Sequence, residues 1–367
     1  MRNLQRLLIP GAVLQSVMIG GGYGTGREVV EYFTRFGAGP GLLGLALAGV
    51  GIAVVFALSL ELARRAGAYD YRTFFKALLG RFWMSYEVLL LLLIMLVLGV
   101  ISAASQGMLL RLLPDLSPVL SALLFVAVTV SLLLFGRTWV MRLLTLWSFV
   151  LYAAFGALLT VVWVRFGENL GSAFKTPGDG VGWVLSALRY VGYNVTAVPV
   201  VLFAARALRS KRDTAIAGAL GGVLAILPAV ALHLCFLALG PRVYDGVALP
   251  LFALLDVLAA PLLTLCLSVV LLGTFLETAL GDLQGLIERM DRWREERQGA
   301  PFSPWGHGAM ALVLLAAAAV LGQLGVVALI GEGYGTLAWG FILVYILPVL
   351  VWGLRRWRSP ETPENLS

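Results

Sequence analysis

The chain has 367 residues; 60% of them are hydrophobic, 13% are charged, and the formal net charge is +7. Soluble domains carry about 25% charged residues, so this composition and a mean hydropathy of +0.92 exclude an ordinary soluble globular protein. Apolar runs such as residues 89–101 instead predict an all-α protein with many membrane-spanning helices. The apolar residues do not alternate with polar ones, which excludes a β-barrel.

The apolar stretches predict about ten membrane spans. In chain order they cover about residues 7–36, 40–63, 83–112, 117–135, 138–165, 181–207, 214–239, 260–282, 305–324 and 333–354. Between them, residues 69–81 predict a short amphipathic helix at the membrane surface. Residues 167–180 predict a polar loop, residues 241–258 a re-entrant or lid-like loop, and residues 359–367 a polar tail.

The first span is interrupted by glycine. Five of the seven residues from Gly20 to Gly26 are glycines, and each costs a helix roughly 1 kcal/mol relative to Ala. Lipid cannot satisfy the backbone groups that a broken helix exposes, so we expect a discontinuous helix whose break forms part of a binding site. The alternative is a face of small residues that lets two helices approach closely.

The sixth span is also interrupted, at residues 189–194, with Pro199 one turn further on. The two interrupted spans each open a block of five. An odd number of spans places the two blocks in opposite orientations, which predicts an inverted-repeat transporter fold. We expect residues 1–165 to form the first five-helix repeat and residues 181–358 the second, within one membrane domain.

Basic residues predict the orientation. With both termini in the cytoplasm, the loops on that side hold about fourfold more Lys and Arg than the outer loops, as the positive-inside rule requires. We therefore expect a multi-pass protein of the bacterial inner (plasma) membrane.

No side-chain pattern predicts covalent chemistry. Cys235 and Cys266 lie inside apolar runs, as small core residues do. His233 and His307 are too few and too distant to predict a metal site. Without a nucleophile–base pair or a metal-ligand cluster, we expect no enzyme activity, no resident cofactor and no nucleic-acid partner.

The five-plus-five arrangement resembles the LeuT fold of the amino acid–polyamine–organocation superfamily. More closely, GYGTGRE at residues 22–28, followed by YFTRFG at residues 32–37, resembles the opening of the YkvI-like membrane proteins. That resemblance implies a transporter relative without naming a substrate. Arg27 stands where the family pattern has Gln. In sodium-coupled carriers of this fold a neutral Asn beside the break helps to bind one sodium, so the resemblance implies that a guanidinium here removes or replaces that cation site.

The two breaks supply most of the candidate solute contacts. Free N–H groups from Gly24 to Arg27 and the guanidinium favour a carboxylate, and carbonyls near Gly192 favour an ammonium group. Alternatively, Arg27 pairs only with Glu28, Glu31 or Glu332. The candidate substrate-binding residues are Gly22, Tyr23, Gly24, Thr25, Gly26, Arg27, Tyr190, Gly192, Tyr193, Asn194 and, in the third span, Ser102.

Coupling and gating have separate candidates. Glu277 in the eighth span is a candidate proton carrier, since ionisable residues at membrane depth are costly and usually functional. The resemblance implies a sodium site at Thr274 and Thr278, opposite Gly20 of the first break. Alternatively, Glu277 lies close enough to the membrane surface to reach water. Arg189 and Glu332 are candidates for an outer gate, with a static ion pair as the alternative.

These features predict a secondary active transporter that moves a small amino acid or amine-like solute by alternating access, coupled to sodium or protons. A transporter-like sensor or receptor subunit that binds a solute without moving it is the alternative, and a channel is a third. The expected partners are a small solute and the lipid bilayer.

Overall fold

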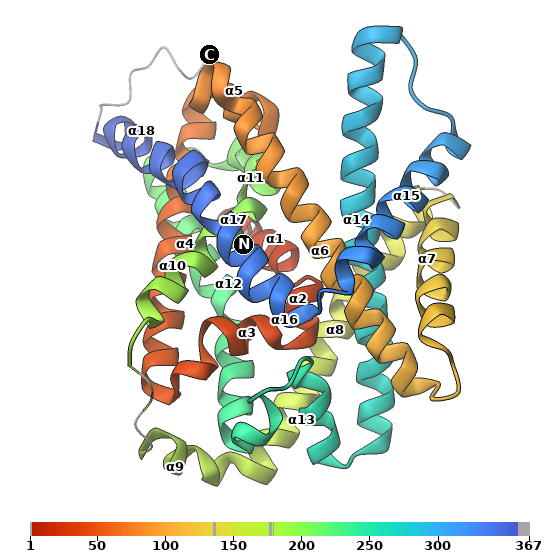
Figure 1. Cartoon of the computed structure of the whole chain (residues 1–367). Coiled ribbons are helices and arrows are strands. Elements are labelled where there is room, and N and C mark those ends of the chain that lie inside the picture. The colour runs from red at the N-terminus through yellow and green to blue at the C-terminus, as the bar shows by residue number, and fades with distance from the viewer. Residues whose placement is uncertain (1, 135–136, 176–177, 179, 359–367) are drawn as a thin grey trace.

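The computed structural model describes residues 2–134, 137–175, 178 and 180–358, and these residues are almost entirely helical (Figure 1). The longer helices are α1 (Arg2–Met18), α4 (Ala38–Ala66), α6 (Trp83–Leu112), α7 (Pro118–Leu134), α8 (Arg137–Phe166), α10 (Trp183–Asn194), α12 (Lys211–Leu239), α14 (Pro261–Gln298), α15 (Pro304–Gly322) and α18 (Leu347–Arg358). The shorter elements are α2 (Gly21–Thr25), α3 (Arg27–Tyr32), η1 (Thr34–Phe36), α5 (Tyr71–Leu79), η2 (Gly80–Phe82), η3 (Gly167–Asn169), α9 (Leu170–Lys175), η4 (Val195–Ala197), α11 (Val198–Val201), η5 (Leu202–Ala207), η6 (Pro241–Val243), α13 (Pro250–Leu258), α16 (Val326–Ala328), η7 (Leu329–Tyr334), α17 (Gly335–Phe341) and η8 (Ile342–Ile346).

Eight helical stretches in the described part of the chain are long and apolar enough to cross a membrane. The apolar α7 is shorter than these stretches, at 17 residues, and the first span is divided among α1, α2 and α3. The expected number of about ten spans is therefore approximately met. The predicted tail, residues 359–367, lies outside the described residues.

Two regions that are predicted as loops contain helix. The predicted polar loop at residues 167–180 holds η3 and α9, and the predicted lid-like loop at residues 241–258 holds η6 and α13. The predicted surface helix is present as α5. Asp70 caps it by accepting a hydrogen bond from the backbone N–H of Thr73 at 2.9 Å, and Phe74 and Phe75 form its buried face.

The helices pack in two groups. The first group holds α1, α4, α10 and α12, with α4 packed along α12 and α1 along α12; the second holds α6, α7, α14 and α15, with α6 packed along α15. Each group combines helices from both halves of the chain, and the two five-helix repeats stay a prediction. In Figure 1 one end of the bundle, here named the α5 end, carries α5 and the end of α14, and the opposite α13 end carries α9 and α13.

The first span is broken as predicted. Gly20 is extended between α1 and α2, and Gly26 has a φ of 73° between α2 and α3. Only glycine adopts this left-handed conformation without strain. The Gly26 Cα also lies so close to Phe236 and Leu251 that an added Cβ would be 2.6 Å from the Phe236 ring, so two constraints require glycine there.

The sixth span is interrupted later than predicted. Residues 189–194 remain α-helical within α10, and the 3₁₀ segment η4 begins at Val195. Pro199 has no N–H to donate to the carbonyl of Val195, so the helix tightens at this point. The tenth span contains two π-helical segments, η7 and η8.

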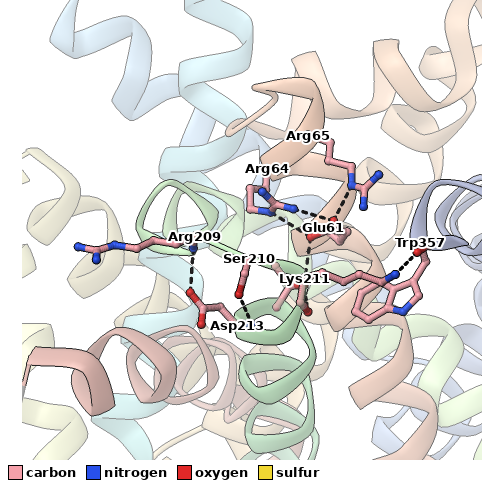
Figure 2. Close-up of polar contacts among 9 residues, drawn as sticks. Glu61, Arg64, Arg65, Arg209, Ser210, Lys211, Asp213 and Trp357 are labelled. Atoms are coloured by element: carbon pink, nitrogen blue, oxygen red, sulfur yellow. Dashed lines mark hydrogen bonds and ion pairs between the residues drawn. The ribbon is translucent and has the colours of Figure 1, made fainter. Parts of the chain in front are cut away.

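A network of buried charges joins four helices near the α5 end (Figure 2). Glu61 of α4 is 1% exposed and accepts hydrogen bonds from Arg64 at 2.8 and 3.0 Å, from Arg65 at 2.5 Å and from the hydroxyl of Thr214 at 3.1 Å. The network therefore ties α4 to α12.

The same network reaches α1 and α18. Asp213 of α12 pairs with Arg6 of α1 at 3.2 Å and accepts a hydrogen bond from the backbone N–H of Arg209 at 2.9 Å. Lys211 donates to the backbone carbonyl of Trp357 in α18. Buried ion pairs of this kind are costly to break from one side.

We predict that Glu61→Ala destabilises the protein by about 3–5 kcal/mol, because it leaves two guanidinium groups buried without their carboxylate. The matched control is Glu296→Ala, which removes the exposed partner of Arg72 and is expected to cost at most about 1 kcal/mol. Apparent melting temperatures of the two purified variants in detergent check this. Equal decreases in the two melting temperatures would contradict it.

Candidate functional site

A cavity of about 380 Å³ lies between the two helix groups. Its wall is formed by the break in the first span, by α3, by the end of α10 and the turns that follow, by α6, by α14 and by η7. The broken helices thus meet a cavity, which is the arrangement expected from the two interruptions.

The cavity extends toward the α5 end. Tyr71 of α5 and Arg289 of α14 line it there, and Val17 and Val200 at its rim are 40% and 58% exposed. On the opposite side, Glu31 of α3 pairs with Arg27 at 2.6 Å and with Arg35. None of the described residues that line the cavity comes from α9 or α13. The described lining of the cavity therefore reaches α5 and does not reach the helices of the α13 end.

The Glu28 carboxylate lies in the cavity wall. The side chain is 6% exposed, and it accepts a hydrogen bond from the Tyr193 hydroxyl at 2.7 Å. Its position depends on Gly22, because a Cβ at Gly22 would lie 1.5 Å from a Glu28 carboxylate oxygen. The glycine-rich break therefore makes room for an acidic side chain.

One face of α14 forms the opposite wall. Thr278, Gly281, Asp282, Gly285 and Arg289 follow one another at helical spacing along this face. The Oδ2 atom of Asp282 is buried and has no hydrogen-bond partner in the described residues. A second carboxylate thus faces the cavity, and one of its oxygens lacks a hydrogen-bond partner among the described residues.

Arg289 closes this wall at the α5 end. Its guanidinium pairs with Glu87 of α6 at 2.9 Å and lies 4.8 Å from the ring centre of Tyr71. It also donates to the backbone carbonyl of Gly285 at 3.0 Å. The charge of Arg289 is therefore already engaged by an acidic residue behind the cavity wall.

Tyrosines join the first, sixth and tenth spans beside the cavity. The hydroxyls of Tyr23 and Tyr190 are hydrogen-bonded, and the Tyr32 hydroxyl donates to the Ile330 carbonyl at 2.9 Å. The rings of Tyr193 and Tyr334 lie 5.1 Å apart, and both line the cavity. These contacts hold the two interrupted spans against each other.

The predicted solute-binding residues divide into two sets. Gly22, Tyr193 and Asn194 line the cavity. The other predicted contacts lie outside its wall and pack the protein instead: Tyr23, Gly24, Thr25, Gly26, Arg27, Tyr190, Gly192 and Ser102. Gly24 packs against Phe275 and Gly192 against Ala338, which is the close packing expected as the alternative. For the residues that line the cavity, contact with a solute stays a prediction.

The expected free N–H groups of the first break are occupied, which corrects the sequence-based expectation. The N–H of Gly24 donates to the Gly20 carbonyl at 3.2 Å, that of Gly26 to the Tyr23 carbonyl at 2.9 Å, and that of Arg27 to the Thr25 hydroxyl at 3.1 Å. The Arg27 side chain points away from the cavity, to Glu31 and to the Val247 carbonyl. The pairing of Arg27 with Glu31, expected as the alternative, is therefore what the structure contains.

The carbonyls near the end of α10 are occupied as well. The Asn194 side chain donates to the Tyr190 carbonyl at 3.0 Å, and the Thr196 hydroxyl donates to the Tyr193 carbonyl at 2.6 Å. The Tyr190 and Tyr193 carbonyls thus already accept a side-chain hydrogen bond each, and an ammonium contact near Gly192 stays a prediction.

Ser102 lies in a small hollow between α6, α7 and α15, together with Gln106. It is therefore separate from the central cavity. Sequence spacing alone does not show which face of a long apolar helix such as α6 turns toward the cavity.

The predicted gate residues do not meet in this conformation. Arg189 lies over the Trp339 ring at 5.7 Å, and Glu332 is exposed. Within the described residues no ion pair joins Arg189 to Glu332.

The coupling candidates also separate. Thr278 lines the cavity, and a Cβ at Gly20 would lie 3.5 Å from its hydroxyl. Thr274 is buried one turn away. Glu277 lies near Tyr152 of α8 and is not among the described residues that line the cavity.

Sequence reasoning does not identify the two cavity carboxylates. It treats Glu28 only as a partner of Arg27, and it places Asp282 at the very end of the eighth span. Acidic residues at membrane depth are the signal that could find them, and Asp282 follows Thr278 by one helical turn. The length of α14, which continues to Gln298, is what places Asp282 inside the protein.

The fold resembles solved structures of transporters at low sequence identity, whereas no protein-family model and no curated protein matches the sequence. The inward-facing conformation of Mhp1 matches 98% of this chain and 79% of its own, with 14% identity and a TM-score of 0.64. A Na⁺-coupled sialic acid symporter matches 94% of this chain and 79% of its own, with 12% identity and a TM-score of 0.61. The manganese transporter of Eremococcus coleocola matches 95% and 78%, with 15% identity and a TM-score of 0.58.

The substrates named for these structures range from a sugar acid to a metal ion, so what they share with this chain is the architecture. With its apolar helices, its interrupted first and sixth spans and these structural neighbours, the chain is a multi-pass membrane protein with the LeuT fold.

Proposed function

We propose that the protein is a secondary active transporter that moves a small amino acid or amine-like solute by alternating access, coupled to sodium or protons. The observation that carries this proposal is the cavity between two separately packed helix groups, whose described lining reaches α5 at one end and includes no residue of α9 or α13 at the other. A site at such an interface is exposed to alternate sides when one group moves against the other.

The orientation follows from charge. Basic residues gather at the α5 end, in Arg64, Arg65, Arg72, Lys76 and the end of α14. The positive-inside rule places this end, and both chain termini, in the cytoplasm of a bacterial inner membrane. The conformation described above is then the inward-facing one.

The cavity favours the amine class of solute. Its interior presents two carboxylates, Glu28 and Asp282, and the guanidinium expected to hold a solute carboxylate is paired with Glu31 outside the wall. Tyr86, Tyr193 and Tyr334 add aromatic surface that attracts organic cations.

A cation also has a place beside the first break. Gly20 and Thr278 face each other at the contact between the first and eighth spans. Thr274 and Thr278 each donate a hydrogen bond to a carbonyl one turn earlier, which leaves hydroxyl lone pairs as oxygen ligands. This arrangement supports a coupling ion at this contact, and one of the structural neighbours is described as Na⁺-coupled.

The first prediction concerns flux. A solute found by a thermal-shift screen of amino acids and amines should accumulate in proteoliposomes that contain the purified protein, and accumulation should require a sodium or proton gradient. Ligand-stabilised melting without uptake would contradict the transporter and support the sensor. Uptake far above roughly 10³ molecules per second, the upper range of ordinary turnover, would contradict a carrier and support a channel.

The second prediction concerns the cavity wall. Gly281 lies in the wall, and a Cβ there would meet no atom of another element within 4 Å, so we expect the Gly281→Leu side chain to occupy cavity space. It should lower uptake at least tenfold and leave the melting temperature unchanged or higher, since leucine favours helix over glycine by about 1 kcal/mol.

The matched control is Gly156→Leu in α8. Gly156 also has open space around its Cα but lies outside the cavity, so the same substitution there should leave uptake unchanged. Equal uptake by the two variants would place the transport route elsewhere.

A further inference from the structure

The two cavity carboxylates lack a neutralising cation. Among the described residues that line the cavity, Arg289 carries the only positive charge, and it is paired with Glu87 at 2.9 Å. Neither Glu28 nor Asp282 forms an ion pair within the described part of the chain. The cavity interior therefore holds two acidic groups that its own wall does not balance.

Burial makes this imbalance costly. Glu28 is 6% exposed and Tyr193 is its hydrogen-bond donor, while the Oδ2 atom of Asp282 is buried without a partner in the described residues. A carboxylate removed from water and left unpaired loses several kcal/mol of solvation free energy. Two species remove the charge from such a site: protons, which convert the carboxylates to acids, and a cation that enters the cavity.

The two carboxylates belong to different moving parts. Glu28 lies on α3, which continues the broken first span, whereas Asp282 lies on α14 of the second helix group. Tyr334 of η7 is close enough to interact electrostatically with both. A cation that pairs with both carboxylates would therefore link α3 to the second helix group.

We propose that Glu28 and Asp282 form a single exchange site that holds either protons or the ammonium group of a cationic solute. This inference rests on the proposed transport function and adds to it the charge of the solute and the direction of coupling. For each positive charge that enters, one carboxylic acid loses its proton to water and becomes the anionic partner of that charge, so a monoamine displaces one proton and a diamine displaces two. When the solute leaves, the carboxylates take protons up again, so solute and protons cross the membrane in opposite directions.

The groups that face this site do not supply another exchangeable proton near neutral pH. Among the described residues, the charged and titratable neighbours of Glu28 are five tyrosines: Tyr23, Tyr32, Tyr190, Tyr193 and Tyr334. Those of Asp282 are Tyr334 and Arg289. Behind Arg289 lie Tyr71, Tyr86 and Glu87. Phenol and guanidinium groups keep their protons in this range, and Glu87 is paired. Protons released on binding would therefore come from Glu28 and Asp282.

The test uses the purified full chain and three amines: butylamine, 1,4-diaminobutane and 2-phenylethylamine. Each is compared with the alcohol of the same skeleton. We expect at least one amine to bind at pH 8 while its alcohol does not. The Kd of that amine should rise by up to about tenfold per pH unit for each competing proton as the pH falls to 6. A pH-indicator dye in weakly buffered solution should record the release of protons when the amine binds.

Two variants assign the protons. Asp282→Asn and Glu28→Gln should each reduce the number of protons released and flatten the pH dependence of Kd, and Asp282→Glu should restore both. Glu295→Gln, which removes an exposed carboxylate from the same helix, is the matched control and should behave as the wild type. Binding by none of the amines, equal binding of the alcohols, or unchanged proton release in both site variants would overturn the exchange site.

Failure of this inference is distinguishable from failure of transport. If sodium-driven uptake is unchanged in Asp282→Asn, the exchange site is contradicted and the transport function is still supported. Proton-linked amine binding without uptake in proteoliposomes would support the exchange site and overturn the transporter.

Discussion

Polar groups at membrane depth have to be satisfied by the protein itself, because the surrounding hydrocarbon offers them no partner. The break in the first span shows how far this chain meets that requirement. The N–H groups of Gly24, Gly26 and Arg27 all have acceptors within the break, and the Thr25 hydroxyl serves as one of them. Arg27 is neutralised by Glu31. Around the cavity, the charges left unbalanced in the described residues are those of the two carboxylates that face it.

The position of these carboxylates depends on small residues. Glu28 occupies space that a side chain at Gly22 would fill, and Asp282 lies on a face of α14 where Gly281 and Gly285 leave the wall open. Glycine in this protein therefore has two different effects. In the first span it ends the helix, and along α14 it leaves an otherwise regular helix with room for a solute.

Much of the architecture could be predicted from hydropathy, since long apolar runs and glycine clusters report directly on spans and breaks. The first break, α5 and most span boundaries agree with the structure for that reason. The site was harder to predict. Tyr190 and Tyr193 are three residues apart on one helix, yet one is buried against Tyr23 and the other faces the cavity. Which face of a helix turns inward depends on packing between distant segments, and the same reason placed Ser102 and Glu277 away from the cavity and left Asp282 unnoticed.

The ion pairs beyond the cavity have a consequence for any movement of the segment that carries them. Arg27, Glu31 and Arg35 all belong to one short segment, α3 and η1, so both ion pairs of Glu31 form within a single piece of backbone. If that segment tilts to uncover the α13 end, its ion pairs travel with it intact. Neutral contacts to other segments are then exchanged for water, among them the Tyr32 hydroxyl on the Ile330 carbonyl and the Ser186 hydroxyl on the Tyr32 carbonyl. Charged contacts between segments are present on both sides of the molecule: Arg111 pairs with Asp256 of α13, and Arg27 donates to the Val247 carbonyl, while the Arg6–Asp213 pair joins α1 to α12.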